Sequence, residues 1–286
     1  MVNAIELQEV RKSFGPVRAV DGLSIAVPRG SVYGFLGPNG AGKTTTLRMI
    51  MDIIRPDSGE IRLFGEPAYS RARGRVGYMP EERGLYRKMT AVAILRYFGS
   101  LKGMTAAQLA QRVPAWLERI DLAAHANKKV EELSRGMHQK LQFAVTVIND
   151  PELVILDEPF SGLDPVNQDL LREIIAEMRR QGRTVLFSTH GMHEAEELCD
   201  FLVLINQGKV VVNGTLDQIR SGHESRTISM EIEGDSSFLR TLPLVATVEP
   251  DGRRLAVTLR EGADPQDLLR TLVERVRVRA FEIKQP

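Results

Sequence analysis

At residues 37–44 the chain reads Gly37-Pro38-Asn39-Gly40-Ala41-Gly42-Lys43-Thr44, which matches the pattern G-x-x-x-x-G-K-[ST] in full. The compact apolar run Val32 to Leu36 precedes this segment and predicts a strand. Apolar residues recur at helical spacing after it, at Leu47, Ile50, Met51 and Ile54. A strand, a glycine-rich loop and a helix in this order are the context in which the pattern forms a phosphate-binding loop.

The loop predicts a site for a nucleoside triphosphate. Its glycines let backbone N–H groups turn toward the phosphates, where a Cβ would obstruct the approach. Lys43 is expected to reach the β- and γ-phosphates and the Thr44 hydroxyl to bind Mg²⁺, with Thr45 beside them among the binding residues. The alternative is a glycine-rich turn with a chance lysine, which the flanking strand and helix disfavour.

A second apolar strand, Leu153 to Leu156, ends in Asp157-Glu158-Pro159. Asp157 is predicted to hold Mg²⁺ through its coordination shell. Glu158 is predicted to receive a proton from the attacking water or to orient that water, a role that contributes roughly 10²–10⁴-fold in rate. Two acids at a strand end often form only a solvated turn, but a phosphate-binding loop upstream favours a hydrolytic site.

Composition limits the class of protein. The chain has 286 residues, of which 43% are hydrophobic and 26% charged, as is usual for a folded globular protein. A net charge of +1 argues against the broad basic surface of nucleic-acid-binding proteins, so no nucleic-acid partner is expected. The single cysteine, Cys199, lies in an apolar stretch and is predicted to be buried. No signal-peptide core and no apolar run near the ~20 residues of a membrane span is found, so a role at a membrane would need another chain.

Alternating strands and helices predict an α/β fold with a mainly parallel sheet covered on both faces. Short strands are expected at Ala4–Val10 and Leu23–Val27, separated by turns at Gly15-Pro16 and Asp21-Gly22. From about Leu85 to Ile148 the apolar spacing becomes helical. We therefore expect a helical subdomain at residues 85–148, inserted between two halves of the α/β domain.

A boundary near Ser221 to Ser225 is expected to divide an α/β domain of residues 1–221 from a small domain of residues 225–286. The pattern beyond it predicts strand, helix, strand, strand, helix and strand, at Thr227–Ile232, Ser236–Leu242, Val245–Val248, Arg254–Leu259, Pro265–Val273 and Val276–Ile283. The order βαββαβ is that of the ferredoxin-like α+β unit. Because Ser225 to Pro286 contains neither cysteine nor histidine, we expect an accessory domain with a dimerisation or regulatory role rather than a metal site.

A third motif, Leu133-Ser134-Arg135-Gly136-Met137, opens a predicted helix shortly before Asp157. With it the chain resembles the ATP-binding subunits of ABC transporters, over roughly Ala4 to Ile219. The family signature is Leu-Ser-Gly-Gly-Gln, and Ser134 and Gly136 match the residues that touch the γ-phosphate, while arginine and methionine replace its third and fifth residues. The resemblance implies a P-loop NTPase fold with a RecA-like core, a helical insertion and antiparallel N-terminal strands. It also implies ATP, and the sequence contains no complete Asn-Lys-x-Asp guanine motif.

The resemblance assigns three further positions. Ser161-Gly162-Leu163-Asp164 is similar to the family's D-loop, which places Asp164 at the contact between two ATPase subunits. His190 resembles the switch histidine at the γ-phosphate, and Phe14 resembles the aromatic residue that stacks on adenine. The alternatives are a helix cap for His190 and a plain core position for Phe14.

Glu81 stands where the family has a Q-loop glutamine, within the segment Gly77 to Tyr86. A glutamate can still bind Mg²⁺ or a water, but it adds negative charge beside the γ-phosphate. The form Pro-Glu-Glu-Arg-Gly-Leu-Tyr and the C-terminal βαββαβ pattern resemble an exporter subgroup that includes sodium-efflux and drug-export ATPase subunits. The alternative for Glu81 to Arg83 is a solvated charged loop.

The resemblance finally implies a shared mechanism, with Lys43, Glu158 and His190 as catalytic residues. Ser134 and Gly136 of one subunit close over ATP on the loop of another, so two ATP·Mg²⁺ lie between head-to-tail subunits, either a homodimer or a pair of paralogues. Closure drives a separate integral-membrane permease at the inner face of the cell membrane, through the helical insertion and the Glu81 loop. Two alternatives are a soluble ABC ATPase acting on ribosomes or nucleic acid, and a regulatory subunit that barely hydrolyses ATP.

Overall fold

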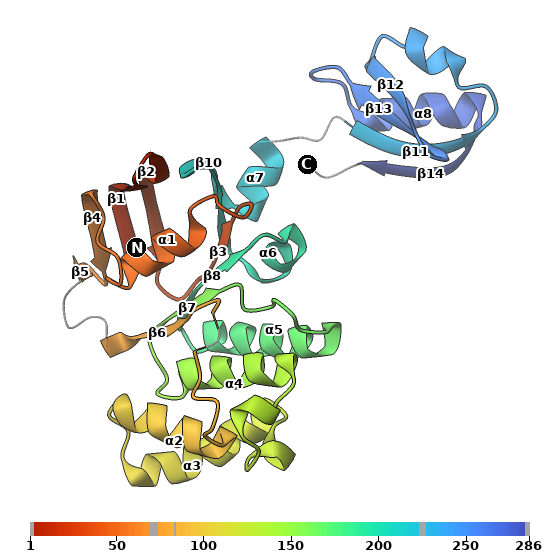
Figure 1. The fold of residues 1–286 in the computed structure, drawn as a ribbon. Helices are drawn as coiled ribbons and strands as arrows, with labels where there is room; N and C mark the ends of the chain where they lie inside the picture. Colours follow the sequence, from red (N-terminus) through yellow and green to blue (C-terminus); the bar gives the residue numbers. More distant parts are fainter. Residues whose placement is uncertain (1–2, 69–73, 83, 223–226, 284–286) are drawn as a thin grey trace. The chain divides into compact units, whose positions relative to one another are not determined.

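The computed structural model describes residues 3–68, 74–82, 84–222 and 227–283. The chain forms two compact units, Met1–Leu216 and Asp217–Pro286 (Figure 1). The boundary expected near Ser221 to Ser225 falls on the end of helix α7 (Leu216–Gly222) and on residues 223–226, which lie outside the described residues.

A six-stranded sheet forms the centre of the first unit, with the strand order β10-β9-β3-β8-β7-β6. The pairs from β9 to β6 are parallel, and β10 is antiparallel at the edge. Its strands are β3 (Val32–Leu36), β6 (Val76–Met79), β7 (Leu153–Asp157), β8 (Thr184–Thr189), β9 (Phe201–Asn206) and β10 (Lys209–Thr215). The mainly parallel sheet predicted from the sequence is therefore confirmed.

The carboxyl ends of four strands meet at one edge of this sheet. Leu36, the last residue of β3, pairs with Thr189 at the end of β8. Asp157, the last residue of β7, pairs with Ser188. Strand β6 ends beside them at Met79. Because the strands are parallel and in register, the segments that follow them all start at this edge, which is where open α/β sheets bind ligands.

Helix α1 (Lys43–Ile50) packs between the central sheet and a second, antiparallel sheet (Figure 1). Its buried side chains share one core with β1 and β2 on one side and with Tyr33 and Phe35 of β3 on the other. Helices α5 (Pro165–Arg180) and α6 (Met192–Leu198) pack against β8. Cys199, which follows α6, is buried as predicted.

The antiparallel sheet has the order β2-β1-β4-β5, with strands β1 (Asn3–Phe14), β2 (Val17–Pro28), β4 (Ser58–Leu63) and β5 (Glu66–Pro67). The turn expected at Gly15-Pro16 joins β1 to β2. The turn expected at Asp21-Gly22 is wrong, because β2 continues through both residues. The register passes from Leu23 to Asp21 and leaves Gly22 unpaired, so the glycine marks a bulge in the ladder rather than its end.

The helical insertion follows β6 and is built as predicted. It contains α2 (Ala91–Leu101), α3 (Ala106–Arg119) and α4 (Arg135–Val147), with short 3₁₀ helices η2 (Ala123–His125) and η3 (Val130–Glu132) between α3 and α4. Thr90 caps the start of α2, and Thr105 with Gln108 forms a capping box at the start of α3. Local sequence therefore fixes where each of these helices begins.

The second unit is a four-stranded antiparallel sheet of order β12-β13-β11-β14. Its elements are β11 (Thr227–Glu233), the 3₁₀ helix η4 (Ser237–Thr241), β12 (Val245–Asp251), β13 (Arg254–Leu259), α8 (Pro265–Arg275) and β14 (Arg277–Ile283). This order is that of a ferredoxin-like unit, as predicted. The first helix, expected at Ser236–Leu242, is only a 3₁₀ helix of five residues, in which Leu239 is buried.

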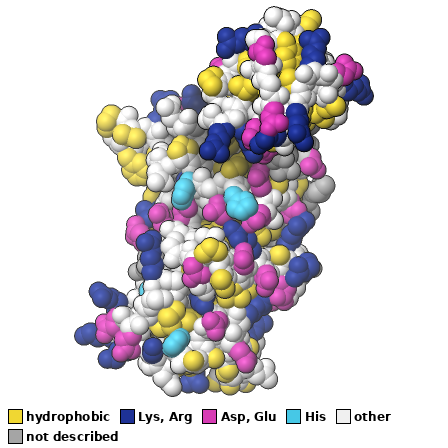
Figure 2. All heavy atoms as spheres, turned by 90° about the vertical axis from the view of Figure 1, so that its right-hand side faces the viewer, with side chains coloured by type: hydrophobic (Ala, Val, Ile, Leu, Met, Phe, Trp, Pro, Cys, Tyr) yellow, Lys and Arg dark blue, Asp and Glu magenta, His cyan; other side chains and the backbone are white. Residues whose placement is uncertain are grey.

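No helix in the described part of the chain is long and apolar enough to cross a bilayer. On the face drawn in Figure 2, acidic and basic side chains are interspersed.

Candidate functional site

A pocket of about 390 Å³ opens at the carboxyl edge of the central sheet. Six of the eight residues of the predicted phosphate loop line it, together with Thr45, Glu158, Glu81 and Ala19. The other two loop residues, Gly37 and Ala41, are buried. The structure thus brings together residues from β2, the loop after β3, the segment after β6 and the end of β7.

The loop conformation depends on Gly42, which precedes α1. Gly42 has φ +104, a backbone conformation that only glycine adopts without strain. A Cβ at this position would also collide with the carbonyl oxygen of Ala19. No side chain caps α1, and its first turn contains no acidic residue. The N–H groups of this turn therefore face the pocket as an anion-binding helix terminus.

Lys43 is buried beneath the loop. Its Nζ donates to the carbonyl oxygens of Gly37 at 2.7 Å and Pro38 at 3.3 Å, and lies 3.5 Å from Oε1 of Glu158. The ammonium group is thus held between its own loop and the carboxylate at the end of β7. An anion entering the pocket would meet this buried positive charge, which interacts more strongly there than in water.

Asp157 is fully buried and uses only one of its carboxylate oxygens within the chain. Oδ1 accepts a 2.5 Å hydrogen bond from Ser188 Oγ on the neighbouring strand β8. Oδ2 has no hydrogen-bond partner among the described residues. Nearby, burial raises the pKa of Tyr78 to about 12, and the charge of Asp157 adds to this shift. Asp157 therefore keeps one carboxylate oxygen free for a ligand.

Glu158 lies between Lys43 and His190. Its backbone has φ +50, which is uncommon for a residue other than glycine, and its N–H donates to Ser188 Oγ at 3.0 Å. Oε2 lies 3.0 Å from Nδ1 of His190, and Oε1 faces Lys43. Helix α6 begins after Gly191 with no side-chain cap, so His190 contacts Glu158 rather than capping that helix. The arrangement holds a carboxylate over the pocket, in position to accept a proton.

Glu81 follows β6 and lines the pocket together with the residues of the phosphate loop. The carbonyl oxygens on either side of it accept hydrogen bonds from Gln142 Nε2, at 2.7 Å for Pro80 and 3.2 Å for Glu82. Glu82 forms an ion pair with Arg48 of α1 at 3.0 Å. Arg83 lies outside the described residues. Hydrogen bonds therefore fix the backbone on both sides of Glu81, while the side chains of Glu81 and Glu82 remain exposed, as a solvated charged segment would have them.

Ser134, Gly136 and Asp164 are not among the residues that line the pocket. Ser134 precedes α4, and its Oγ accepts the N–H of Met137 at 3.2 Å. Asp164 caps α5 by accepting the N–H of Asn167 at 2.9 Å, and this hydrogen bond holds the pKa of its carboxyl below its usual range. The start of α4 lies against the D-loop, because a Cβ on Gly136 would be 3.5 Å from Leu163 Cδ2.

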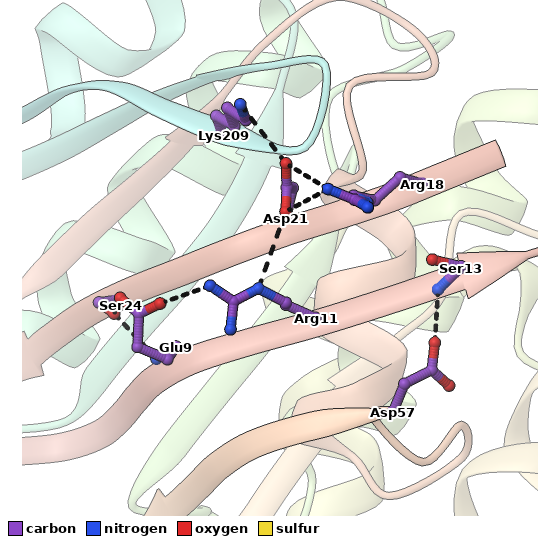
Figure 3. A network of polar contacts seen from close by, with 8 residues as sticks. All are labelled: Glu9, Arg11, Ser13, Arg18, Asp21, Ser24, Asp57 and Lys209. Atoms are coloured by element: carbon purple, nitrogen blue, oxygen red, sulfur yellow. Dashed lines mark hydrogen bonds and ion pairs between the residues drawn. The ribbon is translucent and has the colours of Figure 1, made fainter.

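Phe14 ends β1, and 49% of its surface is exposed, so the alternative of a core residue is wrong. Asp57 accepts a 2.7 Å hydrogen bond from Ser13 N, which fixes the backbone just before Phe14 (Figure 3). It also accepts one from Lys12 Nζ, at 2.7 Å. Ala19, five residues further along the same hairpin, lines the pocket. The Phe14 ring is therefore accessible at the tip of a hairpin that reaches the pocket.

A second polar network fixes this hairpin against the central sheet (Figure 3). Asp21 of β2 forms ion pairs with Arg18 at 3.2 Å, Lys209 of β10 at 3.4 Å and Arg11 at 3.8 Å. Burial alone raises the pKa of Asp21, but hydrogen bonds and charges from Arg18 and Lys209 outweigh it and lower the pKa. The ionised carboxylate joins the two sheets beside the pocket.

Comparison with known proteins identifies the family. Residues 20–161 match the family model described as ABC transporter, and residues 214–286 match one described as ATP-binding protein DrrA1-3-like, C-terminal domain. The uncharacterized ABC transporter ATP-binding protein YhaQ of Bacillus subtilis is 39% identical over 282 residues, covering 99% of this chain and 95% of that one. The chain belongs to the ATP-binding subunits of ABC transporters. It is therefore the ATP-hydrolysing subunit of a transporter, as the resemblance implied.

Other relatives and a solved structure show the same likeness over most of the chain. Nod factor export ATP-binding protein I of Ralstonia nicotianae is 40% identical over 283 residues, covering 97% of this chain and 87% of that one. The protein of the same name from Paraburkholderia xenovorans is 46% identical over 258 residues, covering 88% and 84%. A solved structure described as the ATP binding subunit of an ABC transporter has a TM-score of 0.72 and 31% identity, covering 77% of this chain and 92% of that one.

The sequence does not predict three polar residues that hold this ABC ATPase site together. Ser188 sits inside an apolar strand, and only the register of β7 and β8 shows that it faces Asp157. Gln139 and Gln142 are buried on α4, at 2% and 4% exposure. A pair of glutamines within a predicted buried helix is the only feature of the sequence that points to them, because buried amides need partners.

Proposed function

We propose that this ABC subunit closes head-to-tail with a second ATPase subunit, a copy of itself or a paralogue, around two ATP·Mg²⁺. The observation that carries the proposal is the lining of the pocket, which holds Lys43, Thr44 and Glu158 but neither Ser134 nor Gly136. The start of α4 is another helix N-terminus, whose positive end can face an anion, and among the described residues it does not line the pocket of its own chain. Supplied by a partner, it would complete the site.

In the proposed reaction Lys43 neutralises phosphate charge and Glu158 accepts the proton of the attacking water. Lys43 Nζ lies 3.5 Å from Oε1 of Glu158. A γ-phosphate near Lys43 offers that ammonium group a new anionic partner, which leaves Glu158 to the water and to His190. His190 then holds the carboxylate in place through its 3.0 Å contact. Phe14 is proposed to stack on the adenine.

The residues present fit a Mg²⁺ ion. The free Oδ2 of Asp157 and the Thr44 hydroxyl offer hard oxygen ligands or partners for the water shell of the ion, and Glu81 adds a carboxylate to the pocket lining. When bound, the ion would neutralise negative charge on the phosphates. Asp157 stays oriented for this role through its hydrogen bond from Ser188.

We further propose that closure drives an integral-membrane permease, on the inner face of the membrane, in the direction of export. Support for export comes from the relatives named for Nod factor export, whose likeness covers 88–97% of this chain. The helical insertion and the Glu81 segment would contact the permease. Exposed aromatic rings lie there side by side, since the Tyr86 ring is 5.6 Å from that of Tyr97, and 54% of the Tyr86 surface is exposed. Sodium ions, drugs or similar compounds remain the proposed cargo.

Glu158→Gln tests the shared site. The substitution keeps the shape of the side chain but removes the proton acceptor, so hydrolysis should fall by at least ~100-fold while ATP binding persists. The variant should then elute as a dimer in size-exclusion chromatography with ATP and as a monomer without it. Glu118→Gln, on the exposed surface of α3, is the matched control and should behave as the wild type. Turnover near that of the wild type, or a monomer at saturating ATP, would refute the proposal.

Purification from membranes tests the transport role. The chain should co-purify with a multi-span membrane protein, and its ATPase rate should change when that protein is present. ATPase activity stimulated by RNA or DNA, with no membrane partner, would favour the alternative of an ABC ATPase that acts on ribosomes or nucleic acid.

A further inference from the structure

Two buried glutamines on α4 hold the two segments that carry the acidic residues of the pocket. Gln139 Nε2 donates to the carbonyl oxygens of Pro159 at 3.0 Å and Glu158 at 3.4 Å. Gln142 Nε2 donates to the carbonyl oxygens of Pro80 and Glu82, on either side of Glu81. The glutamines are three residues apart, so they lie on one face of the helix. One helical face thus fixes the backbone at both Glu158 and Glu81.

The same helix packs tightly against the strand that leads to Glu81. A Cβ on Gly77 of β6 would lie 2.6 Å from the carbonyl oxygen of Thr146 on α4, so the absence of a side chain there permits the close approach. Two residues later β6 ends, and the Glu81 segment begins. A shift of α4 would therefore be transmitted to this segment by direct contact and by the two hydrogen bonds of Gln142.

The first turn of α4 contacts the D-loop of its own chain. The Arg135 side chain lies against Gly162, and Gly136 lies next to Leu163. This turn is also the part of the chain that, in the proposed dimer, meets the ATP held by the other subunit. Helix α4 therefore runs from one ATP site to the other: its start serves the partner's nucleotide, and its next two turns hold Glu158 and Glu81 at its own.

We propose that Gln139 and Gln142 are positioning residues that couple the two ATP sites, so that engagement of the partner's ATP by the start of α4 sets Glu158 and Glu81 for hydrolysis in the chain's own site. This inference rests on the shared site proposed above. Lost hydrogen bonds at these positions would uncouple the sites without removing any group that touches ATP. We therefore expect the cooperativity of ATP hydrolysis between the two sites to depend on Gln139 and Gln142, which do not line the pocket.

The test uses the full-length chain and two variants, Gln139→Met and Gln142→Met. Methionine keeps the length of the side chain and removes both N–H donors. Thr146→Val is the matched control, because Thr146 is also buried on α4 and its Oγ1 donates to the carbonyl oxygen of Gln142 within the helix. For each protein we would measure the melting temperature, the affinity for a fluorescent ATP analogue and the hydrolysis rate against ATP concentration.

Both methionine variants should bind the analogue within about 2-fold of the wild type, while kcat falls about 10-fold and the Hill coefficient drops from near 2 toward 1. Adding Ser134→Ala to either variant should cause little further loss, because both changes interrupt one connection. A role limited to stability would lower the melting temperature of all three variants and leave the Hill coefficient unchanged.

The inference is overturned if both methionine variants match Thr146→Val in kcat and Hill coefficient, or if their losses add to that of Ser134→Ala. If one variant does not fold, the other decides, since each glutamine holds its own segment. A wild type with a Hill coefficient of 1 and no loss in Ser134→Ala would instead overturn the shared site itself. Losses in Ser134→Ala without losses in the glutamine variants would overturn only the coupling.

Discussion

Helices α1 and α4 both begin beside glycines that the sequence marks for phosphate contact, yet their starts differ. Helix α1 follows Gly42, has no side-chain cap, and opens into the pocket of its own chain. Helix α4 follows Ser134, whose hydroxyl accepts the N–H of Met137, and its start is absent from that pocket. Both helices offer the positive end of a dipole to an anion.

The difference shows what each start requires. The first N–H groups of α1 have no side-chain partner, so a bound phosphate is the group that satisfies them. The first turn of α4 is already stabilised by Ser134, and its later turns are fixed by Gln139 and Gln142. We infer that the phosphate loop is completed by its ligand, whereas α4 is formed in advance and can be presented to a partner.

Lys43→Ala should give the largest effect and act on the α1 side alone. The change removes the buried ammonium that faces the phosphates and leaves Glu158 without its nearby cation. ATP affinity should fall about 100- to 1,000-fold, or ~3–4 kcal/mol, in a titration with a fluorescent analogue. Lys88→Ala, on an exposed loop, is the control. Affinity near that of the wild type would show that the helix start binds phosphate without the lysine.

Lys102→Met probes the far end of α4. Lys102 Nζ donates to the carbonyl oxygens of Val145 at 2.7 Å and Thr146 at 2.8 Å, and burial lowers its pKa from 10.5 to about 8. Below pH 8 the ammonium is charged in both the folded and unfolded chains, and its burial opposes folding in full. Between about pH 8 and 10.5 the folded chain releases its proton first, so the wild type regains stability relative to the variant.

The gain should reach up to about 3 kcal/mol across that interval, from the size of the pKa difference. Urea unfolding of both proteins at pH 7.5 and at pH 10 measures it. The difference between the two unfolding free energies should shift in favour of the wild type at the higher pH. A difference that is the same at both pH values would show that Lys102 keeps an ordinary pKa and that α4 is not anchored by a buried cation.

The two helix starts also differ in how far the sequence predicts them. The local sequence pattern predicts the phosphate loop. The residue types alone indicate its geometry, because a glycine at Gly42 permits the backbone conformation there and Lys43 supplies the cation. The end of β7 is predicted equally well, because the apolar run Leu153 to Leu156 leads directly into Asp157, the last residue of the strand. Ser134 is predicted as a helix start by the same local rules. These features depend on residues close together in the chain.

The contacts of α4 depend on residues far apart in the chain. Gln139 bonds to a carbonyl group 20 residues away, and Gln142 to one 62 residues away. Backbone carbonyl groups are present at every residue, so nothing in the sequence marks the acceptor. The role of Ser188 is likewise not predictable, because the residues around it read only as an apolar strand. Gly22 lies at a bulge, although a glycine after an aspartate more often marks a turn. The partners of these residues become visible only in the folded structure, from strand register and helix packing.

Phe14→Ala acts on the α1 side with a smaller effect than loss of Lys43. If the exposed ring stacks on adenine, its removal should lower ATP affinity by ~10-fold, within the about 1–3 kcal/mol typical of base stacking. Dimer closure at saturating ATP should be unchanged. Val17→Ala, on the same hairpin and also exposed, is the control. Equal affinities for the two variants would remove Phe14 from the adenine site.

Ser134→Ala and Ser134→Asp separate the two roles of the α4 start. Alanine removes the cap on Met137, so the free energy of unfolding should fall by about 1 kcal/mol. It also removes the hydroxyl proposed to meet the partner's γ-phosphate, so hydrolysis should fall while ATP affinity of the monomer stays the same.

Aspartate is an equally good cap and should restore stability, but it places a negative charge toward a phosphate. Its hydrolysis rate should therefore stay as low as that of Ser134→Ala, or fall further. Urea unfolding and ATPase assays on both variants make the comparison. If hydrolysis recovers together with stability in Ser134→Asp, Ser134 acts only as a helix cap. In that case α4 would no longer differ from α1 in being directed at a partner's nucleotide.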